Sequence, residues 1–249
     1  MQILGGLLGG SFVLASLVVG SRLVLLARRT RRVAELHIGA GLLLLAVFGY
    51  PLMVVARRAQ ALPDSTRSTV AFVGALCLAV GGWWIVCFVR GVFRRESRAA
   101  SFVVWAYAAV AGGLLAWQSV APGWWTWVQD QQGPWAAARW ITLVPICWGG
   151  VESLRYWVRM RRRLALGLTD ALVTDRFRLF GISMLAGFVA NAGTVVYQVR
   201  GVDVIGTAVG AVVVSPASIA AVALWLAFLP PAAYRRWIHD RSNRLVISK

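Results

Sequence analysis

The chain has 249 residues, of which 59% are hydrophobic and only 14% are charged. A water-soluble globule could not bury this much apolar surface, and the charged share is about half that of a typical soluble protein. With 26 Lys and Arg against nine Asp and Glu, the formal net charge is +17. This composition excludes a soluble enzyme, a secreted disulfide-stabilised domain and a disordered tail, and it indicates an integral membrane protein.

Seven stretches are long and apolar enough to cross a bilayer, which takes about 20 residues of helix. The connections between them carry Arg, Pro, Gly, Asp and Gln, which are typical of turns. The sequence therefore predicts an all-α fold, a bundle of seven transmembrane helices in a single domain over residues 1–249. In chain order the predicted spans are residues 3–27, 33–56, 69–93, 101–121, 135–158, 178–199 and 204–228.

The cations are distributed unevenly over the connections. The joins after the first, third and fifth spans and the C-terminal tail hold twenty Lys and Arg, whereas the other three joins hold five. Because such residues concentrate in short cytoplasmic loops, this alternation predicts the N-terminus outside and the C-terminus in the cytoplasm. No positively charged region precedes the first span and no cleavage site follows it, so we expect it to be retained. The abundant Arg favours a multi-pass protein of a bacterial inner membrane.

The basic face has a simple expected partner. Anionic lipid headgroups attract cytoplasmic cations, with a contribution of about 1 kcal/mol per cation. Nucleic acid is not expected to bind, because no helix-turn-helix or aromatic-interleaved segment accompanies the charges. Gly pairs at four-residue spacing in the first and last spans allow close helix contact. Such contact can form within the bundle, in a homodimer or with a partner membrane protein, and the sequence does not choose among these.

Six of the 13 Trp residues lie between Trp117 and Trp140, around the join between the fourth and fifth spans. Trp is favoured at the headgroup level because its ring is apolar and its N–H is hydrated. The pattern favours an aromatic belt in the outer leaflet. In a sharper alternative, the segment with Trp124, Trp125 and Trp127 caps an outward-facing pocket.

Ionisable residues inside the spans are few, and each costs about 2.5–3.5 kcal/mol near the bilayer centre on insertion scales. Glu35 and His37 lie at the start of the second span, and Glu152 and Arg155 lie in the inner third of the fifth. All four are expected in one cytoplasmic layer, and Glu152 and Arg155 share a helix face and can pair. The layer is either structural ion pairing or a functional switch in which His37 titrates near neutral pH.

Neutral polar residues are also sparse. Asn191, Thr194 and Gln198 are spaced three and four residues apart, so they form a stripe on the predicted outer half of the sixth span. Such groups commonly join helices by hydrogen bonds. Alternatively, this stripe and Tyr50 line a cavity that opens outward.

Three prolines, Pro51, Pro145 and Pro216, lie inside the second, fifth and seventh spans. Each removes a backbone hydrogen bond and permits a kink. We expect bends at these positions, either static or acting as hinges.

The sequence carries no catalytic or metal-binding pattern. It has two His, nine acidic residues and neither an HExxH nor a GxSxG motif. Cys77, Cys87 and Cys147 lie inside apolar runs without metal or disulfide spacing. The only Lys is Lys249, which excludes the Schiff-base lysine that a retinal-binding pump needs in its seventh span. We expect a protein that is not an enzyme and that holds no metal or cofactor.

The inner join between the fifth and sixth spans reads Arg-Arg-Arg-Leu-Ala-Leu-Gly-Leu-Thr-Asp at 161–170 and Asp-Arg-Phe-Arg-Leu-Phe-Gly at 175–181. It resembles the corresponding join of bacterial seven-helix sensor-type membrane domains. In that group the bundle stands alone or precedes a histidine kinase or cyclase module. The resemblance implies a receptor-like bundle. Because no output domain is expected after residue 228, it also implies that a signal passes to a separate protein through the Arg-rich face.

Three functions are compatible with these features. The first is a receptor or sensor for a small apolar ligand, the lipid state or a partner helix. The second is a transporter or permease for a small apolar or anionic solute, and the third is an accessory subunit of a membrane complex. A pocket that opens only outward favours the receptor, whereas broken helices that meet near the midplane in an inverted repeat favour the transporter.

Overall fold

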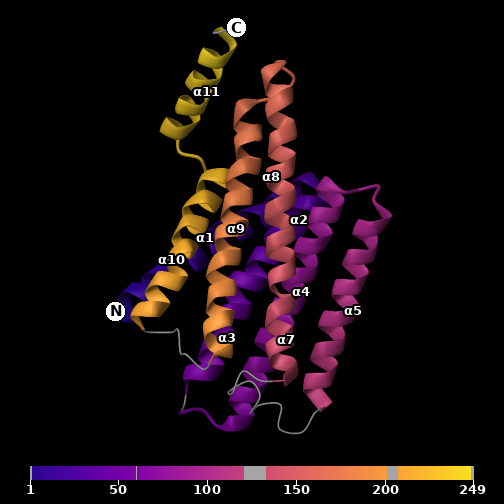
Figure 1. Cartoon of the computed structure of the whole chain (residues 1–249), viewed down its shortest axis with the longest axis vertical. Helices are drawn as coiled ribbons and strands as arrows, with labels where there is room; N and C mark the ends of the chain where they lie inside the picture. The colour runs from indigo at the N-terminus through magenta and orange to yellow at the C-terminus, as the bar shows by residue number, and fades with distance from the viewer. Residues whose placement is uncertain (1, 60, 121–132, 201–206, 248–249) are drawn as a thin grey trace.

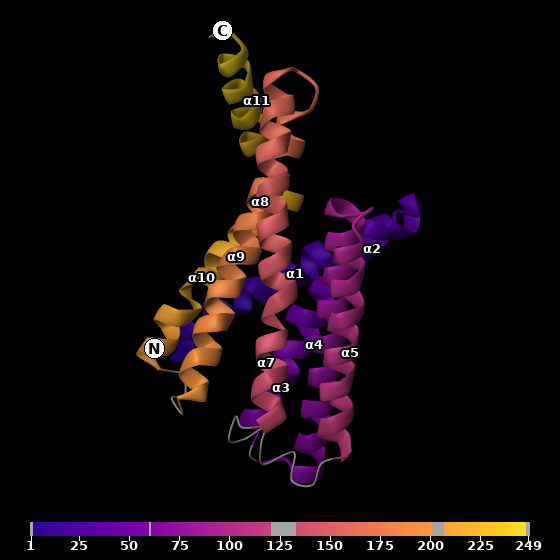
Figure 2. The same ribbon diagram turned by 45° about the vertical axis from the view of Figure 1, so that its right-hand side comes forward.

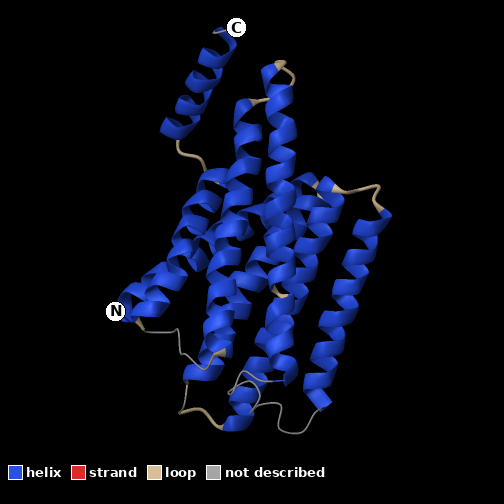
Figure 3. Ribbon diagram, viewed as in Figure 1, coloured by secondary structure: helices blue, strands red, loops and turns tan. Residues whose placement is uncertain are grey.

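The computed structural model describes residues 2–59, 61–120, 133–200 and 207–247. Within these ranges nearly every residue is helical and none is in a strand (Figure 3). The helices are α1 (Gln2–Thr30), α2 (Val33–Leu42), the π-helix η1 (Leu43–Gly49), α3 (Tyr50–Arg58), α4 (Asp64–Phe93), α5 (Arg98–Val120), α7 (Gly133–Ile141), α8 (Leu143–Ala165), α9 (Ala171–Val199), α10 (Ala208–Phe228) and α11 (Ala232–Ile247).

Six of these helical segments are long and apolar enough to cross a membrane, so the chain is a helical protein built for a bilayer. The segment predicted as the fifth span is not among the six. It is divided between α7 and α8, and α8 carries Glu152, Arg155 and Arg159 within its length. The six segments are Gly9–Thr30, Val33–Arg58, Asp64–Phe93, Arg98–Val120, Ala171–Tyr197 and Ala208–Phe228.

Several helices begin before the apolar stretch that predicted them. α9 starts at Ala171, about two turns ahead of the predicted span, because Asp170 caps it. The Asp170 carboxylate accepts hydrogen bonds from the N–H groups of Leu172 and Val173 at 2.7 and 3.1 Å. Apolarity marks the part of a helix that suits lipid, whereas the cap decides where the helix starts.

The connections lie at the two ends of an elongated bundle (Figures 1 and 2). The α1–α2, α4–α5 and α8–α9 joins lie toward the end that carries α11, and the α3–α4 join lies at the other end. We call the first of these the Arg-rich end, because it holds the joins with the most cations. α4 packs against α2, α3, α5 and α8, and α9 packs against α8 and α10.

Glycine lets the first two helices approach closely. A Cβ on Gly39 would lie 2.9 Å from the carbonyl oxygen of Gly20, so neither position has room for a side chain. Buried apolar side chains continue this contact through the bundle, from Val19 in α1 through Ile85 in α4 to Leu224 in α10. Close backbone approach at small residues and dense apolar packing are the usual means of helix association in lipid.

The helix of the predicted second span widens ahead of Pro51. Proline has no N–H, and its ring clashes with the carbonyl one turn earlier in an α-helix. The preceding residues therefore form the π-helix η1, in which the N–H of Tyr50 donates to the carbonyl of Leu45, five residues back. In the predicted fifth span the helix is interrupted at Thr142, close to Pro145. In contrast, Pro216 lies within the continuous α10.

Candidate functional site

A cavity of about 780 Å³ lies among the helices toward the end of the bundle opposite the Arg-rich end. Residues of α1, η1, α3, α4, α5, α7, α8, α9 and α10 line it, so it is enclosed by almost the whole bundle. Most of its wall is apolar. Its size falls within the range of about 300–1,000 Å³ that is usual for small-molecule sites.

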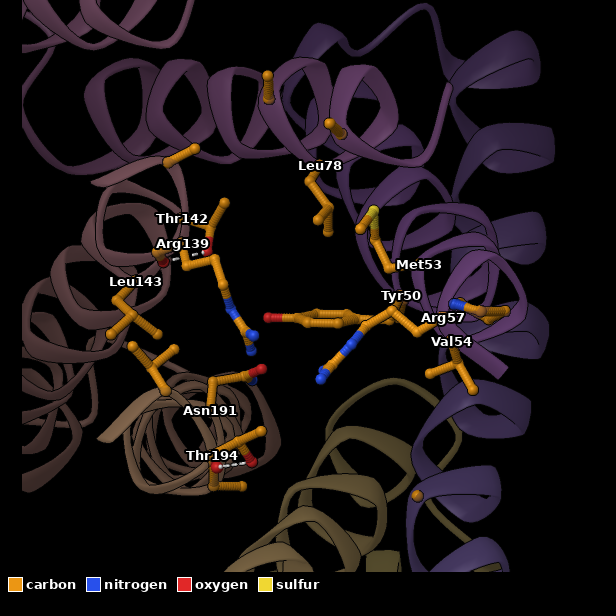
Figure 4. Close-up of a pocket in the computed structure, with 18 of the residues that line it drawn as sticks. Tyr50, Met53, Val54, Arg57, Leu78, Arg139, Thr142, Leu143, Asn191 and Thr194 are labelled. Carbon is orange, nitrogen blue, oxygen red and sulfur yellow. Dashed lines mark hydrogen bonds between the residues drawn. The ribbon is translucent and has the colours of Figure 1, made fainter. Parts of the chain in front are cut away.

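Four polar side chains from three different helices point toward the middle of this cavity (Figure 4). Tyr50 extends from the start of α3, directly after the π-helix, and Arg57 comes from the last turn of the same helix. Arg139 reaches in from α7 and Asn191 from α9. None of the described residues that line the cavity is Asp or Glu, so this part of the wall is cationic.

Local hydrogen bonds hold the smaller polar groups of the wall in place. The Thr142 hydroxyl donates to the carbonyl of Arg139 at 2.7 Å, and the Thr194 hydroxyl donates to the carbonyl of Ala190 at 2.8 Å. The Asn191 amide nitrogen donates to the carbonyl of Gly187, also at 2.8 Å. These bonds to the preceding turn fix the direction of each side chain.

Gln118, near the end of α5, also lines the cavity and is only 1% exposed. Neither its amide oxygen nor its amide nitrogen has a hydrogen-bond partner among the described residues. A buried polar group without a partner costs about 1–3 kcal/mol, so such groups are rare and call for an explanation. A ligand in the cavity would supply the missing partner.

Three of the residues expected to line an outer cavity, Tyr50, Asn191 and Thr194, line this one. The side chain of Gln198 lies outside the described residues, and so do Trp124, Trp125 and Trp127. Whether the Trp segment caps the cavity therefore stays a prediction.

Sequence reasoning missed the most polar part of the wall. Arg57 and Arg139 are two of the five cations counted with the Arg-poor joins, and neither was expected in a cavity; Gln118 was not singled out. The available signal was the exception to the charge rule: Arg57 and Arg139 are among the few cations in the Arg-poor joins. Because cations are rare in the joins on this side, an Arg there is a candidate for a specific role such as ligand binding.

Packed aromatic rings fill the bundle on the side toward the Arg-rich end. Their centroids are 4.6 to 6.0 Å apart, and most neighbouring pairs meet edge to face. We call this group the aromatic cluster. It consists of Phe88 and Phe93 from α4 and its end, Tyr156 from α8, Phe177 and Phe180 from α9, and Phe228 from α10.

The predicted pair of Glu152 and Arg155 is present, and a third residue joins it. Arg155 lies 3.2 Å from Glu152, while Arg94, from the end of α4, binds both carboxylate oxygens at 2.9 and 3.0 Å. Glu152 is only 5% exposed. The hydrogen bonds to Glu152 raise the pKa of Arg94 above its usual value. The charge inside α8 is thus compensated by a bidentate contact from another helix.

The other two residues of the expected cytoplasmic layer have different neighbours. Glu35 accepts a hydrogen bond from the hydroxyl of Thr30 at 2.6 Å. The ring of His37 packs edge to face against Trp84 with centroids 5.0 Å apart. The contacts of the described residues therefore place Glu35, His37 and the Glu152–Arg155 pair in three separate groups.

A third polar contact attaches the C-terminal helix. The Tyr234 hydroxyl of α11 donates a hydrogen bond to Asp175 of α9, and Arg178 lies 2.7 Å from the same carboxylate. Burial raises the pKa of Tyr234 to about 12, and the hydrogen bond to Asp175 acts in the same direction. The neutral phenol of Tyr234 therefore attaches α11 to α9.

Among the described residues, no three His, Cys, Asp or Glu side chains are grouped so that they could hold a metal ion. Comparison of the chain with protein families, with curated proteins and with solved structures finds no match. The cavity and the contacts around it are therefore the basis for a functional argument.

Proposed function

We propose that this chain is a receptor-like membrane protein, without enzymatic activity, that binds a small ligand in the cavity from the outer side of a bacterial inner membrane. The observation that carries the proposal is the asymmetry of the bundle. Its Arg-poor half holds a cavity with converging polar groups, whereas its Arg-rich half is filled by the aromatic cluster and the Arg94–Glu152 contact.

The proposal includes seven crossings, with the N-terminus outside and the C-terminus in the cytoplasm. The Arg-rich end is assigned to the cytoplasm because cations concentrate there in short loops. α7 and α8 together supply the crossing that is fifth in chain order, and the contacts of Glu152 with Arg94 and Arg155 reduce the cost of placing its charge in the membrane. The basic face then contacts anionic lipid and a separate partner protein that receives the signal.

A transporter for a small apolar or anionic solute is the second candidate. It is favoured by the interruption of two helices beside the cavity, at η1 and at Thr142. A transporter must open the cavity to both sides in turn, which would require the aromatic cluster to separate. The two functions therefore differ in whether the cavity is ever reached from the cytoplasm. An accessory subunit of a membrane complex is a further alternative.

Thiol labelling from each side tests this difference. In a chain whose three cysteines are replaced by alanine, Asn191→Cys places one thiol in the cavity wall. The receptor predicts reaction with a membrane-impermeant thiol reagent in intact cells but none in inside-out vesicles. Ser183→Cys is the control, because Ser183 is buried and bonded to the carbonyl of Ala220. Labelling of Asn191→Cys from both sides would identify a transporter.

The orientation is tested in the same way with two exposed positions. Ser65→Cys lies in the first turn of α4, and Leu168→Cys lies in the join between α8 and α9. We expect the first to react only from outside and the second only from the cytoplasm. Reaction of both from the same side would contradict the proposed topology.

A further inference from the structure

We propose that the ligand of this cavity is an amphiphile with an anionic head group, bound with its head between Arg57 and Arg139 and an alkyl chain against the apolar wall. This inference rests on the proposed function, because it assumes that the cavity binds a ligand. It goes further in naming the chemical class of that ligand.

The head site follows from the two arginines. Their side chains come from α3 and α7 and point toward the same central space beside the Tyr50 hydroxyl (Figure 4). Two guanidinium groups that converge repel each other, and an anion between them turns this repulsion into two attractive contacts. The planar donor fork of Arg matches a carboxylate or a phosphate, which accepts two parallel hydrogen bonds.

Gln118 is an independent observation that points to a polar ligand. It is almost fully buried, lines the same cavity and has neither amide atom bonded to a described residue. Its NH₂ group can donate to an oxygen of the head group, and its oxygen can accept from a protonated one. An entirely apolar ligand would leave this amide buried and without a partner, at a cost that favours a polar head.

The chain of the ligand is inferred from the rest of the wall. Away from the polar groups the cavity is lined by aliphatic side chains, among them Leu78, Met53 and Leu143 (Figure 4). A free inorganic anion would leave this wall in contact with water, whereas an alkyl chain removes it from water. A cationic amphiphile would be repelled by the arginines, so the charge and the apolar wall together select an anionic amphiphile.

The same chemistry has two sources: a fatty-acid-like molecule from the outer aqueous side, or an anionic lipid of the surrounding bilayer. The experiment uses the full chain in nanodiscs of phosphatidylcholine, and three probes of equal chain length: dodecanoate, dodecanol and dodecyltrimethylammonium. We expect dodecanoate to bind at least about tenfold more tightly than either of the others, because only it gains charge-assisted hydrogen bonds.

Variants locate the head group. Arg139→Gln and Arg57→Gln are each expected to weaken dodecanoate binding about tenfold and to leave dodecanol binding unchanged. Gln118→Leu is expected to weaken it severalfold. Arg200→Gln is the matched control, since Arg200 is an exposed cation that is not among the described residues of the cavity wall. If one Arg variant does not fold, dodecanoate binding is measured in the other. The comparison of the three probes on the unmodified chain needs no variant.

A second set of nanodiscs, with phosphatidylglycerol replacing part of the phosphatidylcholine, separates the two sources. Competition of phosphatidylglycerol with dodecanoate assigns the site to membrane lipid, and unchanged dodecanoate binding assigns it to a molecule from the aqueous side. Equal affinities for dodecanoate and dodecanol, or dodecanoate binding unaffected in both Arg variants, would overturn the inference. If Asn191→Cys is still labelled only from outside, the proposed function survives that result.

Discussion

Arg94 and Glu152 are 58 residues apart in the sequence, yet the guanidinium of Arg94 donates hydrogen bonds to both oxygens of the Glu152 carboxylate. This contact joins the end of α4 to the middle of α8. Arg94 is 37% exposed at its side chain, while Glu152 is almost buried. The pair therefore lies at the boundary between the packed bundle and its surroundings, and it closes the Arg-rich half next to the aromatic cluster.

Replacing Glu152 tests the structural importance of this contact. Glu152→Gln keeps the shape of the side chain but removes the charge that Arg94 and Arg155 share. We expect a loss of about 1–3 kcal/mol in folding stability, less than for a fully buried pair because Arg94 is partly exposed. The melting temperature of the purified protein in detergent measures it. Glu96→Gln, in the exposed α4–α5 join, is the control, and a loss no larger than in that control would contradict the expectation.

Gly82→Ala tests the contact between α4 and α5. A Cβ at Gly82 would collide with the hydroxyl of Tyr107, and Gly112→Ala is the control because nothing lies within 4 Å of a Cβ there. We expect Gly82→Ala to destabilise the protein by about 1–3 kcal/mol, as overpacking does, and Gly112→Ala to be neutral. The melting temperature again reports the effect.

A double variant identifies the cause of that effect. The Tyr107 hydroxyl is buried and has no hydrogen-bond partner among the described residues, so Tyr107→Phe should not destabilise the protein. Added to Gly82→Ala, it should restore part of the lost stability by removing the closest atom. If it restores none, the collision with the hydroxyl is not the reason for the loss.

The attachment of α11 should depend on pH. Because the pKa of Tyr234 is raised from 10.0 to about 12, the fold favours its neutral form. The contribution of Tyr234 is therefore fully present below pH 10 and is lost as the pH rises through about 12. We expect the difference in melting temperature between the wild type and Tyr234→Phe to be constant up to about pH 10 and to shrink above it. A difference that grows above that pH would show the opposite sign.

The start of α9 depends on Asp170. Asp170→Ala removes the two hydrogen bonds to the first turn and should cost about 0.5–2 kcal/mol, whereas Asp170→Asn should keep most of the cap. Hydrogen exchange at the amides of Leu172 and Val173 measures this locally. Equal protection in the Ala and Asn variants would mean that the cap does not set the start of the helix.

The helices were largely predictable because length and apolarity alone decide which segments suit a membrane. Their ends were not, as α9 shows: polar caps lie outside the apolar runs. A bend was expected at Pro145, but the sequence did not show that the helix would be divided into α7 and α8, with the break three residues earlier at Thr142.

For the cavity residues, position in the sequence indicated how deep each side chain lies along its span but not which way it points. Tyr50, Asn191 and Thr194 stood out because polar groups are rare in apolar spans. Arg57 and Arg139 did not, because an Arg near the end of a span normally extends to the headgroups. Glu35 and His37 were expected at the depth of Glu152, but only the packing of the helices shows which residues at one depth meet.

The π-helix ahead of Pro51 has a consequence for how this cavity could change over time. A π-turn holds one more residue than an α-turn, so removing a single residue from Leu43–Gly49 would let the segment close as an α-helix, with Tyr50 facing nearly the same way as before. Removing a residue from an α-helical turn of the same span would instead rotate Tyr50 by about 100° relative to the residues before it and turn its hydroxyl away from the cavity. Leu43–Gly49 is therefore the stretch of this span where we expect the loss of one codon to leave the binding wall intact.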